Sequence, residues 1–128
     1  MRSEVIAREE KEQRSVQEVF EDHLRKRQAG RVEEDIARNF AKDVILLTGY
    51  GVYRGHEGVR RSARILYQQL QDATFQYLTK LVEGDVAFLE WTGEGGGNQV
   101  QDGADSFLFR DGKIVVQTIH YTVEPVGD

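Results

Sequence analysis

"GADSFLFRDGKIVVQTIHYTV", residues 103–123, is the stretch that decides the fold. Over residues 105–109, polar and aromatic side chains share one face at every second position, which is typical of a strand with a buried side. Arg-Asp-Gly-Lys at residues 110–113 predicts a hairpin turn, and residues 114–123 predict a long final strand. The stretch therefore predicts two antiparallel strands joined by a hairpin.

The predicted sheet extends upstream of this hairpin. From residue 73 the pattern has a period of two, with Phe75, Tyr77, Thr79 and Leu81 alternating with polar residues. Glu-Gly-Asp at residues 83–85 predicts a turn, residues 86–92 predict another strand, and residues 93–103 predict a glycine-rich loop. The second half of the chain is therefore expected to be a meander of four antiparallel strands.

Helical signals dominate the first half of the chain. Ser-Val-Gln-Glu at residues 15–18 is a capping box, and helical spacing then continues to a stop signal at Gly30. A short second helix follows, and a third begins near His56; between them, the aliphatic residues 44–48 predict one buried strand. The apolar stripes of the second and third helices are Val32, Ile36 and Phe40, and Val59, Ala63, Leu66 and Leu70.

These elements predict an α+β fold in which three amino-terminal helices cover one face of a strongly curved, mainly antiparallel sheet. Residues 15–125 are expected to form a single domain, preceded by a charged extension at residues 1–14.

The composition argues against several classes of function. The chain has 128 residues and a formal net charge of −5, whereas nucleic-acid binding needs a surplus of Lys and Arg. It has no cysteine, and its three histidines are not spaced as paired metal ligands. The longest aliphatic run, residues 44–47, is too short for a membrane span. We therefore expect no nucleic acid, metal or membrane partner. The charged start without an apolar core predicts a cytoplasmic protein.

A glycine-rich stretch, GYGVYRG at residues 49–55, precedes the third helix. A phosphate-binding loop would end in Gly-Lys-Ser/Thr, and a dinucleotide fingerprint starting at Gly49 would need glycine where Arg54 stands. Both patterns fail, so we expect no cofactor. We predict that these glycines form a bend between the early strand and the third helix.

Two polar residues on apolar faces are the candidate catalytic groups. Asp105 shares a strand face with Phe107 and Phe109, where an ionised carboxylate is costly unless it is paired or protonated. Either the polar face begins there, or the carboxyl has a raised pKa and works in a pocket. His23 lies on the apolar face of the first helix, as a core histidine or as a proton donor or acceptor facing a cavity. Glu90 is a second acidic candidate.

Aromatic and apolar side chains are expected to enclose these groups in a cavity for a small hydrophobic molecule. The predicted lining residues are Phe20, Tyr50, Tyr53, Tyr67, Glu90, Trp91, Phe107, Gln117, Ile119 and Tyr121.

Three segments, in this order, resemble the nuclear transport factor 2-like superfamily, specifically its SnoaL-like, polyketide cyclase-like branch. They are "VFEDHLRKRQAGRVEEDIARNFAKDV" at residues 19–44, "GVYRGHEGVRR" at residues 51–61 and "GADSFLFRDGKIV" at residues 103–115. The resemblance covers roughly residues 15–125. It implies a cystatin-like cone whose sheet wraps against three helices around a small, mostly apolar molecule, and a homodimer formed through the sheet.

The resemblance also implies roles for single residues. Asp105 is similar in position to the oxyanion-hole carboxyl of steroid isomerases and to an acid/base aspartate of polyketide cyclases. His23 falls where the isomerase has its oxyanion-hole tyrosine. Thr48 stands where the isomerase has its base aspartate, which argues against steroid isomerase chemistry. Enzymes and non-catalytic modules share this fold, so the fold alone does not decide the function.

Two functions are therefore open. In the first, the protein is a cofactor-independent enzyme of the isomerase, cyclase or hydro-lyase type: Asp105 transfers a proton at a carbon beside a carbonyl, and His23 polarises the oxygen or donates to it. In the second, it is a non-catalytic ligand-binding or dimerisation module in which Asp105 and His23 satisfy each other. For the dimer, alternation leaves a mixed surface on the opposite face of the last strands, at Leu108, Val116, Thr118 and His120.

Overall fold

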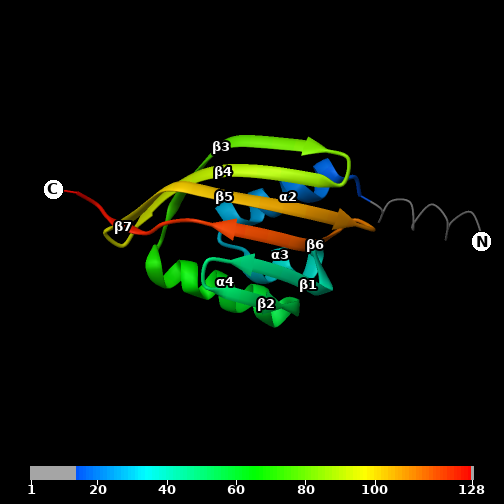
Figure 1. Ribbon diagram of the computed structural model, residues 1–128, viewed down its shortest axis with the longest axis horizontal. Helices are drawn as coiled ribbons and strands as arrows, with labels where there is room; N and C mark the ends of the chain where they lie inside the picture. The colour runs from blue at the N-terminus through cyan, green and yellow to red at the C-terminus, as the bar shows by residue number, and fades with distance from the viewer. Residues whose placement is uncertain (1–13, 128) are drawn as a thin grey trace, which may run out of the picture.

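The computed structural model describes residues 14–127, which form three helices and seven strands (Figure 1). The helices are α2 (Val16–Gln28), α3 (Val32–Asn39) and α4 (Gly55–Gln69). The strands are β1 (Phe40–Thr48), β2 (Gly51–Arg54), β3 (Thr74–Glu83), β4 (Val86–Gly95), β5 (Asn98–Arg110), β6 (Lys113–His120) and β7 (Glu124–Pro125). Residues 1–13, nearly all of the predicted extension, and residue 128 lie outside the described part of the chain.

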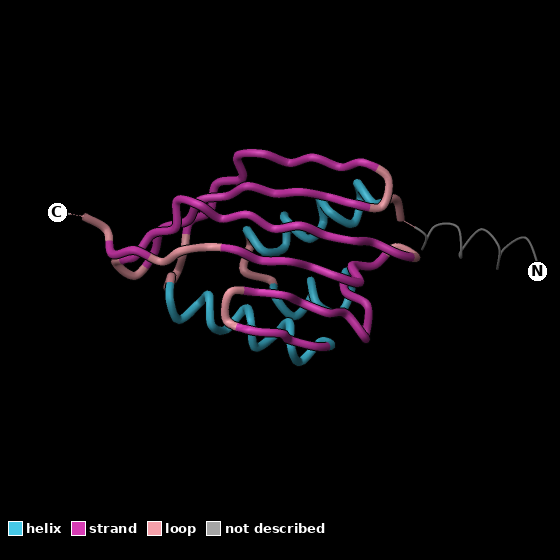
Figure 2. The backbone as a smooth tube through the Cα atoms, in the orientation of Figure 1, coloured by secondary structure: helices cyan, strands magenta, loops and turns pink. Residues whose placement is uncertain are grey.

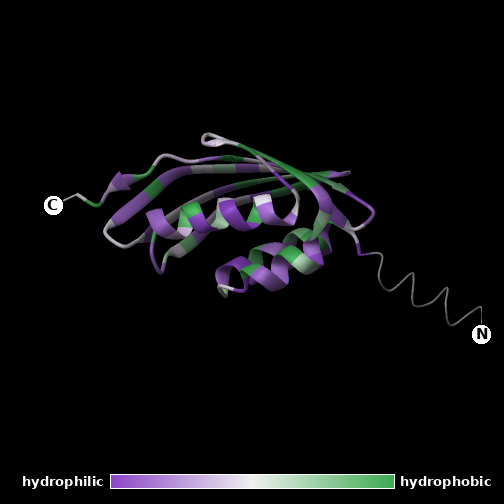
Figure 3. Cartoon of the chain, turned by 90° about the horizontal axis from the view of Figure 1, so that it is seen from below, coloured by the Kyte–Doolittle hydropathy of each residue, from purple (hydrophilic) through white to green (hydrophobic). Residues whose placement is uncertain are grey.

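The strands form one sheet in the order β2-β1-β6-β5-β4-β3, and β7 pairs with the beginning of β5 (Figure 2). Neighbouring strands are antiparallel except β1 and β6, which run parallel. Seen from below, the curved sheet arches over the helices, which lie together on one side of it (Figure 3). This arrangement confirms the predicted α+β fold, a curved and mainly antiparallel sheet packed on three helices.

The predicted ends of the first helix are confirmed. The Ser15 hydroxyl accepts from the Glu18 amide at 3.1 Å, and the Glu18 carboxylate accepts from the Ser15 amide at 2.8 Å. At the other end Gly30 has a φ of 74°, so the chain leaves the helix in the left-handed region that favours glycine. Its amide and the next one donate to the carbonyls of Arg27 and Lys26.

Three local predictions are wrong. The bend predicted at residues 49–55 contains strand β2, which folds back along β1. The loop predicted at residues 93–103 is paired instead, because β4 and β5 continue to a turn at Gly96 and Gly97, both with positive φ. The last strand ends at His120, earlier than expected. In the first two cases the strands contain glycines and short polar runs, whose pairing depends on the neighbouring backbone and leaves no side-chain period.

A bulge in β3 alters the predicted alternation. The register against β4 shifts between Tyr77 and Thr79, so one extra residue is accommodated there. Beyond the shift Leu81 is 60% exposed on the outer face, whereas Val82 packs against the core. The prediction that Leu81 shares a face with Tyr77 is therefore wrong. Bulges also bend strands, which contributes to the curvature of the sheet.

The core lies between the helices and the concave side of the sheet. Its largest fully buried side chains include Phe20, Ile36, Phe40, Leu46, Leu70, Phe107 and Ile114. Within residues 14–127, none of the helices has the length and apolar character that a membrane crossing requires.

Candidate functional site

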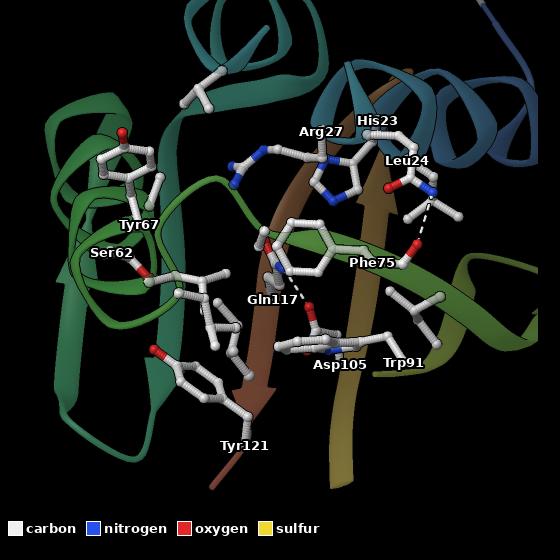
Figure 4. Close-up of a pocket in the computed structure, with 18 of the residues that line it drawn as sticks. His23, Leu24, Arg27, Ser62, Tyr67, Phe75, Trp91, Asp105, Gln117 and Tyr121 are labelled. Atoms are coloured by element: carbon white, nitrogen blue, oxygen red, sulfur yellow. Dashed lines mark hydrogen bonds between the residues drawn. The ribbon is translucent and has the colours of Figure 1, made fainter. Parts of the chain in front are cut away.

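A cavity of about 270 Å³ lies between the helices and the concave face of the sheet. Its walls come from α2, α4 and β3, and its floor from inward side chains of β4, β5 and β6 (Figure 4). Exposed residues at its edge, among them Gln28, Tyr67 and Asp72, place the mouth between the end of α2 and α4. Most of the lining is apolar, with a few polar groups, which is the usual composition of a small-molecule site.

Asp105 lies on the floor of this cavity and is 8% exposed. The alternation along β5 turns it inward together with Phe107 and Phe109. Its two oxygens accept hydrogen bonds from Nε1 of Trp91 at 3.0 Å and from Nε2 of Gln117 at 3.1 Å. Both donors belong to adjacent strands, so the sheet itself fixes the carboxyl group (Figure 4).

The glycine two residues before Asp105 is needed for this geometry. Gly103 pairs with Trp91 across β4 and β5, and a Cβ atom at Gly103 would overlap the indole ring. The missing side chain therefore lets the indole lie flat over β5 and bring Nε1 to the carboxylate.

Burial raises the pKa of Asp105 to about 6, because the charged form loses solvation that the bonds from Trp91 and Gln117 and the nearby His23 and Arg27 restore only in part. A carboxyl group with this pKa exchanges protons near neutral pH, as general acids and bases do.

His23 also lines the cavity, and it is 4% exposed. Its Nδ1 lies 2.8 Å from Oδ2 of Asp35, and its ring packs edge-on against Phe40 and Phe107. Among residues 14–127, Nε2 of His23 has no hydrogen-bond partner. Every solvent-inaccessible side-chain nitrogen or oxygen in that part of the chain does have a partner, so Nε2 is accessible and faces the open space of the cavity. In the neutral ring this nitrogen is the acceptor, and in the protonated ring it is a donor.

Asp105 and His23 do not satisfy each other, contrary to the binding-module expectation. The carboxyl group of Asp105 is bonded to Trp91 and Gln117, and the imidazole of His23 is bonded to Asp35, so both groups remain directed at the cavity.

Asp35 holds His23 from behind and is fully buried. It also accepts from Nε of Arg27 at 2.6 Å and from Nδ2 of Asn39 at 2.8 Å. Burial alone would raise the pKa of Asp35, but His23, Arg27 and the amide of Asn39 together hold it well below its usual range. Asp35 is therefore ionised at all ordinary pH values.

The same polar cluster continues to the surface. Asn39 also donates to Asp22 at 2.9 Å and accepts from Arg14 at 2.6 Å. Burial opposes ionisation of Asp22, but bonds from Lys26, Asn39 and a neighbouring arginine lower its pKa to about 2. Arg14, assigned from sequence to the extension, is thus tied to the folded domain.

The structure places five of the predicted lining residues along the cavity: Tyr67, Trp91, Gln117, Ile119 and Tyr121. Phe20 and Phe107 instead pack in the core beside it, with ring centroids 5.3 Å apart. Glu90 is exposed on the outer face, because Trp91 next to it occupies the inner face of β4.

The two remaining predicted lining residues also lie outside the cavity. Tyr50 is 50% exposed, and its ring centroid lies 5.8 Å from that of Tyr121. Tyr53 packs against the start of α4 at Gly58, where a Cβ atom would come within 2.8 Å of the Tyr53 backbone.

Sequence reasoning missed two polar residues of the site, Arg27 and Asp35. Arg27 follows His23 by one helical turn, so the helical spacing already puts both on one face. Asp35 and Asn39 are likewise one turn apart, beside the apolar stripe of α3. Polar residues at such spacing on two adjoining helices are the signal that could have identified the cluster.

Comparisons with known proteins agree with this architecture. Residues 16–117 match the SnoaL-like domain family. None of the curated proteins matches the chain in sequence. An NTF2-like protein of unknown function from Burkholderia xenovorans LB400 is similar in structure, with a TM-score of 0.71 and 18% identity over 88% of this chain and 86% of that one. A candidate polyketide cyclase from Sinorhizobium meliloti gives a TM-score of 0.66 and 18% identity over 80% and 93%.

A third similar structure is that of TerC co-crystallised with polyporic acid. Its TM-score is 0.68, with 17% identity over 84% of this chain and 91% of that one. At these identities the likeness supports the fold alone.

Proposed function

The chain belongs to the SnoaL-like domain family, and on that premise we propose that it catalyses proton transfer on a small hydrophobic carbonyl compound. The observation that carries the proposal is Asp105, a buried carboxyl group at the floor of an apolar cavity with a pKa of about 6. The similar structures include a candidate polyketide cyclase, which favours a reaction at a carbon beside a carbonyl.

In the proposed reaction the Asp105 carboxylate removes a proton from a carbon next to the carbonyl group. The electron pair of the C–H bond moves to form an enolate, and Asp105 becomes the neutral acid. When its ring is protonated, His23 donates a hydrogen bond from Nε2 to the enolate oxygen, and Asp35 fixes the ring through Nδ1. Asp105 then returns its proton to a different carbon. Alternatively, the enolate carbon attacks a second carbonyl and closes a ring, the electron pair of that C=O bond moves to its oxygen, and the resulting alkoxide takes the proton from Asp105.

Hydrogen–deuterium exchange tests this step before the natural substrate is known. Small aromatic ketones, 4-phenylbutan-2-one among them, are incubated with the protein in D₂O at pH 7, and loss of the α-proton signals is followed by NMR. We expect faster exchange than in buffer, and a drop of about 10² in the enhancement for Asp105→Asn. Glu90→Gln, a carboxyl change on the outer face, is the matched control and is expected to exchange like the native protein. Equal rates for the native protein and Asp105→Asn contradict the proposal.

A non-catalytic ligand-binding module is the second candidate function. The observation in its favour is that both oxygens of Asp105 already accept hydrogen bonds, from Trp91 and Gln117. Binding of ketones without any exchange above the buffer rate supports this alternative.

A homodimer through the outer face of the sheet is part of the proposal. Several apolar side chains on that face are about half exposed, namely Leu47, Val52, Leu81 and Val86. Burying such side chains against a second copy is favourable by about 25 cal/mol per Å² of apolar surface. Light scattering at micromolar concentration is expected to give twice the mass of the 14.6 kDa chain, and Val116→Glu, in the middle of the face, is expected to give a monomer. A native monomer contradicts dimerisation.

A further inference from the structure

The guanidinium group of Arg27 lies at the cavity with part of its donor set unused. Arg27 is in the last turn of α2, and its Nε donates to Oδ2 of Asp35 at 2.6 Å. The side chain is 21% exposed and lines the cavity. Among residues 14–127, neither of its terminal nitrogens has a hydrogen-bond partner.

The position of this group is fixed by its surroundings. Asp35 binds the Nε side, and the guanidinium carbon lies 6.0 Å from the centroid of the Phe40 ring. Figure 4 shows the guanidinium extending from α2 toward α4, next to the His23 ring. The two terminal nitrogens therefore form a pre-oriented pair of donors at the side of the cavity.

Arg27 is the permanent cation of the described lining. The other titratable acids and bases there are Asp105 on the floor, His23 on the wall and Asp72 at the mouth, apart from the tyrosine hydroxyls. The α4 wall across from Arg27 is largely apolar and includes Val59, Ala63, Leu66 and Leu70. A bound molecule would therefore meet the planar, positively charged guanidinium group of Arg27 at one end and apolar side chains along the rest of its length.

We propose that the ligand of this cavity is a small apolar molecule that carries a carboxylate, bound in a bidentate pair by the terminal nitrogens of Arg27. This inference rests on the proposed function for the use of the cavity, and it adds the class of the substrate. The planar guanidinium matches carboxylate geometry, which an ammonium does not. The volume of about 270 Å³ lies just below the common range of about 300–1,000 Å³, so the occupant is small.

Trp91, the only tryptophan of the chain, makes the test direct, because it lines the cavity and its fluorescence reports occupancy. The probes are 4-phenylbutanoate and 4-phenylbutanamide, which have nearly the same shape but differ in charge. At pH 7 we expect the native protein to bind the carboxylate at least about tenfold more tightly, as hydrogen bonds between charged groups imply. We expect Arg27→Gln to lose this preference and to keep its affinity for the amide within about twofold.

Two further variants separate charge, geometry and folding. Arg27→Lys keeps the charge without the fork and is expected to retain only part of the preference. Arg31→Gln is the matched control, because Arg31 pairs with Glu34 at the surface and does not line the cavity. If Arg27→Gln still binds the amide, its cavity is intact. If Arg27→Gln loses amide binding, the inference is decided by the affinities of the native protein for the two probes and by the preference of Arg27→Lys.

Three results overturn the inference: equal affinity of the native protein for both probes, a full preference in Arg27→Gln, or no binding of either probe. Failure of the proposed function looks different. Selective carboxylate binding without any α-proton exchange refutes catalysis and leaves the substrate class standing. Exchange of neutral ketones without a carboxylate preference refutes the class and leaves catalysis standing.

Discussion

Asp35 and Asp105 are both buried carboxyl groups near one cavity, and their pKa values move in opposite directions. Asp35 has the cation of Arg27, the ring of His23 and an amide donor around it, which outweigh its loss of solvation. Asp105 accepts hydrogen bonds from two neutral donors, Trp91 and Gln117, and these, together with the weaker influence of His23 and Arg27, do not outweigh its loss of solvation. The two carboxyl groups therefore differ in the charge of the groups that are hydrogen-bonded to them, and this difference separates a structural carboxyl group from a reactive one.

The comparison assigns opposite stability effects to the two groups. A lowered pKa means that ionised Asp35 stabilises the fold, whereas a raised pKa means that ionised Asp105 destabilises it. A group kept at a stability cost in a cavity is characteristic of a functional site. Each of the following variants tests one side of this contrast.

Asp35→Asn is expected to have the largest effect. It leaves Arg27 without its carboxylate and His23 without its fixed partner, so we expect the free energy of unfolding to fall by about 3–5 kcal/mol at pH 7. The loss should be full above the unfolded pKa near 4 and shrink as the pH falls below it, because the carboxylate is then protonated in the unfolded chain. Urea unfolding from pH 3 to pH 8 measures both. Asp43→Asn, at an exposed position of β1, is the control. A loss below 1 kcal/mol at pH 7 would mean that Asp35 is not the anchor of the cluster.

Asp105→Asn is expected to stabilise the protein. The native pKa of about 6 against an unfolded value near 4 corresponds to a penalty of up to about 3 kcal/mol for ionised Asp105, which asparagine avoids. The gain should be full above pH 6, decline as the pH falls, and vanish below pH 4, where both forms are neutral. Thermal unfolding at pH 4 and pH 7 measures the contrast. Destabilisation at pH 7 that persists at pH 4 would place the cost in lost hydrogen bonds and not in ionisation.

The sequence predicted the fold far better than the site. The capping box, the apolar stripes and the hairpin at residues 110–113 are local patterns, and local patterns determine element type. Strand β2 and the turn at Gly96 and Gly97 were not predicted, because glycine-containing strands form through pairing with neighbouring strands and have no side-chain pattern of their own. The face to which a strand residue points also depends on unbroken alternation along the strand. A bulge such as that in β3 reverses the alternation, and no local sequence pattern predicts it.

The inward directions of Asp105 and His23 could be predicted from the local periodicity of the sequence. The residues that are hydrogen-bonded to them could not. Asp35 reaches His23 only because α2 and α3 pack together, and Trp91 reaches Asp105 only because Gly103 makes room in the next strand. Hydrogen bonds between side chains of different elements are tertiary facts, and no single-sequence pattern specifies them.

Gln117→Leu gives the smallest and most specific effect. It removes one of the two donors to the Asp105 carboxylate and leaves Trp91 in place, at nearly the same side-chain volume. The pKa of Asp105 should therefore rise further, by on the order of one unit, which corresponds to about 1.4 kcal/mol. Titration of the Asp105 carboxyl carbon by NMR in both proteins measures the shift. Gln69→Leu, which alters a glutamine bonded to Tyr121 and Tyr50 but not to Asp105, is the control and should leave that pKa unchanged. An unchanged pKa in Gln117→Leu would mean that the hydrogen bond from Gln117, unlike the bonds of the partners of Asp35, carries no weight in the proton affinity of Asp105.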